Sequence, residues 1–97
     1  MTFEEFRRAA TGRTGEPPAG LTPAQQALWH DARGDWDRAH ACAQEDPGRA
    51  GAWVHAYLHR KEGDRGNAAY WYQRANRPVA EGDFAEEWTE IARALAE

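Results

Sequence analysis

The chain has 97 residues, a length that fits one small domain. Its 12 Lys and Arg residues against 16 Asp and Glu residues give a net charge of −4 without any basic block, which excludes the positive stripe of a nucleic-acid-binding protein. A single cysteine excludes an intramolecular disulfide and no apolar run approaches the ~20 residues of a membrane span, so we expect a cytoplasmic protein without membrane or nucleic-acid partners.

Large aliphatic side chains are scarce, because Leu, Ile and Val together number only seven. The chain compensates with 11 aromatic residues, five of them Trp, and with twenty alanines. Aromatic rings bury large areas, and alanine favours helix and allows close approach between helices. We therefore expect a core of aromatic rings packed on alanine.

Capping signals predict three helices in the first half of the chain. Thr2 with Glu5 forms a capping box before a short first helix. Residues 11–20 hold three glycines and two prolines and are predicted to form a loop. Thr22 begins a second helix and Asp35 a third, which ends before residues 47–48, a Pro-Gly pair.

The second half predicts three more helices: one over about 52–62, one in which Ala68, Trp71, Tyr72 and Ala75 recur at helical spacing, and one over about 83–96. Apolar residues recur at helical spacing in each, and Asp64 and Asp83 are placed to cap the last two. No segment alternates with period two, so we expect an all-α fold of five to six short helices. The predicted single domain spans residues 1–97, with antiparallel hairpins at about 22–47 and 51–77 between an N-terminal and a C-terminal flanking helix.

The sequence pattern of one helical hairpin occurs twice in this chain. Residues 27–34 read A-L-W-H-D-A-R-G and residues 56–63 read A-Y-L-H-R-K-E-G, an offset of 29 residues. An Asp follows each copy (Asp35, Asp64), and an Ala lies four residues further on (Ala39, Ala68). Self-similarity at a fixed period indicates stacked copies of one supersecondary unit.

The two runs G-D-W-D-R-A (34–39) and G-D-R-G-N-A (63–68) resemble the inter-helix turn of tetratricopeptide repeats, although the period is 29 rather than 34. The resemblance covers about residues 22–78 and implies a groove lined by the first helix of each hairpin. A second resemblance, carried by residues 55–64 and 70–74, is to a family of uncharacterised bacterial proteins and implies no function.

A groove of this kind would bind a protein or peptide partner, or a second copy of the chain. An aromatic and arginine-rich surface is typical of protein-binding hot spots. The residues expected to make contact are Trp53, Tyr57, Arg60, Tyr70 and Arg74. The alternative is that Trp53 and Tyr57 are core residues, since aromatic residues at helical spacing usually pack inward.

A possible metal or small-ligand site lies in the second copy, as His55-x-x-x-His59-x-x-Glu62. At helical spacing these three side chains fall within about 60° of one another, and imidazole and carboxylate are zinc ligands. His30, which occupies the position of His59 in the first copy, would join them if the hairpins stack side by side. The alternative is that these histidines pack structurally and that no cofactor binds.

The sequence contains no convincing set of catalytic residues. Serine is absent, no glycine-rich phosphate loop occurs, and Cys42 lies about 200° around its helix from His40. The sequence thus favours a small cytoplasmic protein-interaction module similar to tetratricopeptide repeats. A metal- or small-ligand-binding protein that uses His30, His55, His59 and Glu62 is the alternative.

Overall fold

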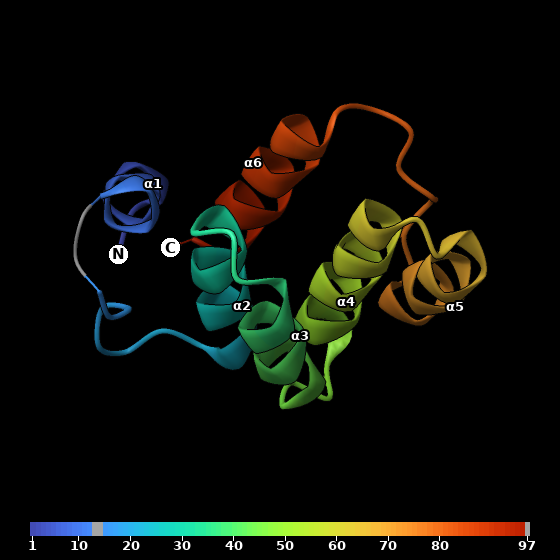
Figure 1. The fold of residues 1–97 in the computed structure, drawn as a ribbon, viewed down its shortest axis with the longest axis horizontal. Coiled ribbons are helices and arrows are strands. Elements are labelled where there is room, and N and C mark those ends of the chain that lie inside the picture. Colours follow the sequence, from blue (N-terminus) through green and yellow to red (C-terminus); the bar gives the residue numbers. More distant parts are fainter. Residues whose placement is uncertain (13–14, 97) are drawn as a thin grey trace.

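The computed structural model describes residues 1–12 and 15–96, and this part of the chain forms α-helices and no strand (Figure 1). The all-α prediction is confirmed. Two residues of the predicted loop, 13 and 14, and the final residue of the predicted domain lie outside the described part. The helices are α1 (Phe3–Thr11), α2 (Pro23–Ala32), α3 (Trp36–Gln44), α4 (Arg49–Glu62), α5 (Arg65–Ala75) and α6 (Phe84–Leu95).

Most of these helices begin where the capping signals predict. Thr2 and Thr22 form capping boxes, and the carboxylates of Asp35, Asp64 and Asp83 accept backbone N–H groups in the first turns of α3, α5 and α6. No helix of the described residues combines the length and the apolar character needed to cross a membrane.

The start of α4 differs from the prediction, because the helix begins at Arg49 rather than near residue 52. Gly51, a poor helix former, lies within the first turns of α4, and the preceding turn folds back onto it. A Cβ at this position would lie 2.2 Å from the main-chain oxygen of Asp46. The glycine therefore permits a close approach between the end of one hairpin and the start of the next.

Helix α4 is the central element of the fold. It contacts α2, α3, α5 and α6, and residues 51–59 are all buried. Helices α1 and α5 lie at opposite ends of the long axis, and α3 and α5 flank α4 (Figure 1). Any side chain on this stretch of α4 must therefore find its partners inside the protein.

The repeated sequence forms the same turn twice. Gly34 and Gly63 adopt left-handed backbone conformations, with φ of 79° and 88°. The N–H groups of Asp35 and Asp64 each donate to the carbonyl five residues earlier, of His30 and His59, at 3.0 Å. These bonds satisfy helix-end carbonyls and reverse the chain, so the two hairpins are geometrically equivalent at their turns.

The core consists of aromatic rings on alanine, as the composition predicts. Trp29, Tyr57 and Tyr72 are nearly inaccessible to solvent. The indole N–H groups of Trp29 and Trp88 donate to the carbonyls of Ala9 and Leu28, at 3.2 and 3.0 Å, so the largest rings are buried without loss of hydrogen bonds.

Two buried carboxylates join the helices around α4. Asp31 on α2 accepts from the Tyr57 hydroxyl at 2.7 Å and from the Lys61 ammonium at 2.9 Å. Glu87 on α6 accepts from Arg60 at 3.0 Å and from the Tyr72 hydroxyl. Burial, together with the neighbouring carboxylate, raises the pKa of both tyrosines, which keeps their hydroxyls as neutral donors.

These contacts predict unequal effects for two tyrosines on neighbouring helices. Tyr57→Ala removes a buried ring and one partner of Asp31, so the free energy of unfolding should fall by about 3–5 kcal/mol. Tyr70 is exposed, and Tyr70→Ala should change stability by less than about 0.5 kcal/mol. Urea unfolding followed by circular dichroism measures both. Equal losses would contradict this account of the core.

Candidate metal centre

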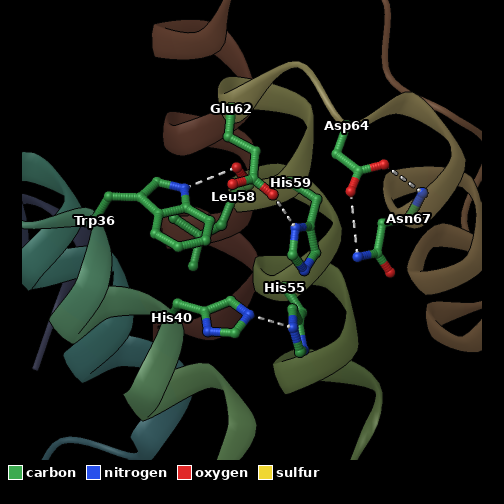
Figure 2. Close-up of polar contacts among 8 residues, drawn as sticks. All are labelled: Trp36, His40, His55, Leu58, His59, Glu62, Asp64 and Asn67. Atoms are coloured by element: carbon green, nitrogen blue, oxygen red, sulfur yellow. Dashed lines mark hydrogen bonds and ion pairs between the residues drawn. The ribbon is translucent and has the colours of Figure 1, made fainter.

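Three histidines from two adjacent helices meet on one side of α4 (Figure 2). His40 belongs to α3, whereas His55 and His59 lie one turn apart on α4. One ring nitrogen of each lies within 4.8 Å of the others. His55 and His59 are each 5% exposed and His40 is partly buried, so the group is largely shielded from solvent.

The geometry follows from helical spacing on both helices. His55 and His59 are four residues apart and share a face of α4, and α3 packs against that helix. Trp36 and His40 show the same spacing on α3, with ring centroids 4.8 Å apart. The Trp36 indole donates to the Leu58 carbonyl at 2.9 Å, and this bond holds α3 with His40 over α4.

Helix α5 supports the group from the other side. The Trp71 ring stacks on His55, with centroids 3.9 Å apart and planes inclined by 16°. The His40 ring meets His55 edge-on at 4.6 Å. His55 is therefore held between an aromatic ring of α5 and an imidazole of α3, which restricts its rotation.

Glu62 determines which nitrogen of His59 faces the other histidines. Nδ1 of His59 lies 2.7 Å from Oε1 of Glu62, which leaves Nε2 for the cluster (Figure 2). A carboxylate on the outer nitrogen of a histidine is the usual support of a metal ligand, because it fixes the ring and strengthens the donor nitrogen.

His40 and His55 face each other through their Nε2 atoms, which are 2.9 Å apart. Without a metal this is a hydrogen bond between two neutral imidazoles. A tetrahedral zinc ion with bonds of about 2.0–2.1 Å holds its nitrogens about 3.3 Å apart. The pair would have to separate by only about 0.4 Å to share one ion.

The surroundings favour the neutral form of His40 and His55, which is the form that binds metal. Burial, with smaller effects from His40 and His59, lowers the pKa of His55 to about 4. Burial and the neighbouring His59 also lower the pKa of His40. Near pH 7 no proton must therefore be removed from either ring before an ion binds.

A second group, formed by His59, Glu62 and Asp64, also places its ligand atoms within 4.8 Å. Asp64 is already engaged as the cap of α5, where its oxygens accept from the backbone and the side chain of Asn67 at 3.1 and 3.5 Å (Figure 2). The three-histidine group has no such competing role and is the better candidate.

The structure brings together His55, His59 and Glu62, three of the four residues expected at the metal site. It places His30 elsewhere, outside the group and edge-on to Trp29 at a centroid distance of 5.1 Å. The repeat makes His30 equivalent to His59, but the helix beside this face of α4 is α3, not α2. His40 is instead the third histidine of the group. Its position four residues after Trp36 was the sequence feature that could have indicated this role.

The five residues expected to contact a partner do not form one exposed surface. Trp53 and Tyr57 are 5% and 2% exposed, so the alternative that they are core residues is confirmed. Arg60 pairs with the buried Glu87 at 2.9 Å. Only Tyr70 and Arg74 are exposed, and they are joined by a hydrogen bond of 3.1 Å.

The chain matches no protein-family model, no curated protein and no solved structure. What this protein binds must therefore be inferred from the geometry of the site itself.

The lowered pKa values predict acid sensitivity of the metal-free protein. Unfolding restores the histidine pKa to about 6.5, so the unfolded state takes up protons below that pH while the native His55 resists them down to about 4. Stability is then complete above pH 6.5 and declines toward pH 4. Thermal unfolding in EDTA across this range measures the decline.

His55→Gln separates this effect from the titration of carboxylates, because glutamine carries no proton to exchange. The variant should lose less stability than the wild type between pH 6.5 and 4. Parallel pH profiles for the two proteins would show that His55 is not the group responsible.

Proposed function

We propose that this protein binds a transition-metal ion, zinc first, through His40, His55 and His59. The observation that carries the proposal is the convergence within 4.8 Å of three imidazoles, two buried and one partly buried, with Glu62 supporting His59. Within the described residues, the side chains of His40 and His55 form a hydrogen bond with each other and with no other group. A packed core would not require three such nitrogens to face one another.

The ligand set limits the choice of ion. Three neutral imidazoles suit zinc, copper or nickel, whereas magnesium and calcium prefer oxygen ligands. Cys42, two residues beyond His40, does not join the group, so the site lacks the thiolate typical of many structural zinc sites. Zinc is the first choice because its d-electrons impose no geometry, so the ion can accept the arrangement of ligands that the protein provides.

Binding would connect the two hairpins. His40 belongs to the α2–α3 pair and His55 and His59 to the α4–α5 pair, so one ion would add a bridge between hairpins that are also joined by packing and by the hydrogen bonds of Trp36 and Asp31. An ion that binds only the native state stabilises it by about 2.7 kcal/mol at one hundred times its dissociation constant.

Zinc titration by calorimetry, with metal analysis of the dialysed protein, tests the proposal. The wild type should bind one ion per chain and unfold at a higher temperature with zinc. His40→Ala, His55→Ala and His59→Ala should each weaken binding by at least about 100-fold, beyond the 10–100-fold typical of outer-shell changes.

His30→Ala is the matched control and should bind zinc like the wild type, since His30 lies outside the group. Absence of uptake by the wild type, or an equal loss in the His30 variant, would refute the proposal. Circular dichroism of each variant shows whether it still folds.

The role of Glu62 gives a separate prediction. Glu62→Gln removes the charged partner of His59 without removing a ligand, so zinc affinity should fall by about 10–100-fold while the stoichiometry stays at one. Glu90→Gln makes the same charge change on the exposed face of α6 and should leave affinity unchanged. Identical affinities in the two variants would exclude a supporting role for Glu62.

A tetratricopeptide-like protein-interaction role, in the cytoplasm, has weaker support. It depends on the repeated turn and on the exposed pair of Tyr70 and Arg74, because two of the other expected contact residues lie in the core. Binding of a protein or peptide partner, or of a second copy, would have to use this smaller surface.

A further inference from the structure

A pocket of about 450 Å³ lies beside the histidine group. Its walls come from the end of α3, the turn into α4, the first turns of α4 and the outer face of α5. His55 and Trp71 form one wall, so the pocket reaches a residue of the metal centre directly. The lining includes Ala43, Asp46, Arg49, Ala52, His55, Trp71 and Arg74.

The histidines leave one position of a tetrahedral ion open. Among the residues that the structure describes, no carboxylate or thiol lies within 4.8 Å of all three imidazoles. Zinc sites with three protein ligands hold an exogenous ligand in the fourth position, whereas structural sites are closed by a fourth side chain. On the proposed function, the fourth ligand must come from outside this part of the chain.

The charges favour an anion in that position. Neutral imidazoles do not offset the two positive charges of the ion, and Glu62 supplies one negative charge through His59. Arg49 and Arg74 add positive charge to the pocket, whereas Asp46 is the only acidic residue among the described residues that line it. One oxygen of Asp46 accepts the N–H of Gly48 at 2.9 Å and helps to shape the turn.

The walls favour an organic rather than an inorganic anion. Ala43, Ala52 and the Trp71 ring give the pocket apolar surface next to its two arginines. The Arg74 guanidinium lies 5.3 Å from the centre of the Trp71 ring, which places a cation at the edge of the apolar wall. A carboxylate attached to a small apolar group would satisfy both features.

We infer that the open metal position binds the carboxylate of a small organic acid, which enters through the pocket beside His55 and lies against Trp71. This inference rests on the proposed metal site and adds the class of its ligand. The arginines attract and balance the carboxylate, and the metal fixes its position.

Cobalt(II) in place of zinc tests the inference, because its visible spectrum reports changes in the ligands of the ion. Acetate and benzoate should change the spectrum in a saturable way, and benzoate should bind more tightly because it covers the apolar wall. Benzamide, which has the same ring without the charge, and chloride should have no comparable effect.

Arg74→Gln and Arg49→Gln should each weaken benzoate binding by about tenfold while cobalt affinity stays unchanged. Arg8→Gln on the exposed face of α1 removes the same charge far from the pocket and should bind benzoate like the wild type. A benzoate affinity that is unchanged in both pocket variants would overturn the role of the pocket.

The outcomes separate the two proposals. If the protein does not bind cobalt or zinc, the proposed function fails and the inference with it. If cobalt binds but carboxylates leave its spectrum unchanged, or chloride and benzamide act equally, only the inference is overturned. If Asp46→Asn alters the spectrum in the absence of added acid, Asp46 is itself the fourth ligand, and the inference is equally overturned.

Discussion

The burial of α4 on all sides is the constraint on which the rest of the structure depends. Helices pack around residues 51–59, and this stretch carries two histidines and a tyrosine among its apolar residues. A buried polar group is costly unless it finds a partner. Tyr57 and His55 find theirs on neighbouring helices, and His59 finds Glu62 on α4 itself. The partners of α4 therefore define both the packing of the domain and its candidate site.

Two kinds of partner meet this need on different sides of the helix. Toward α2, Tyr57 finds a carboxylate, Asp31, which forms a satisfied structural network together with Lys61. Toward α3, His55 finds another imidazole, His40, and the Nε2 atoms of the two rings lie 2.9 Å apart. The first arrangement is complete as it stands, whereas the second belongs to the group that we propose as a metal site. For this reason we propose the histidines, and not the Tyr57–Asp31 pair, as the binding site.

The all-α fold and most helix starts could be predicted because they depend on local chemistry. Capping residues such as Thr22 and the paired glycines at 34 and 63 act within one turn of the chain. The start of α4 could not be predicted in the same way, because local propensity disfavours glycine in a helix. The close approach of Asp46, which leaves no room for a side chain at position 51, is a packing constraint that propensity does not contain.

The site was predictable in part for the same reason. His55, His59 and Glu62 share one helix, so spacing alone brings them together. The third histidine depends on which helix covers that face of α4, and the repeat suggested His30 where packing supplies His40. The orientation of Trp53 was likewise a question of packing, and it points into the core.

The position of α5 has a consequence for how the site is reached. Among the described helices it packs against α4 alone, and its only hydrogen bond to α6 is that of Tyr72 with Glu87. Segments with few neighbours are the first to detach in the local openings of a native protein. Trp71 would move away with α5 and uncover His55 while the rest of the core stays intact. Because the Trp71 ring covers His55 from the α5 side, detachment of α5 would open a second route to the histidine group, besides the pocket at the start of α4.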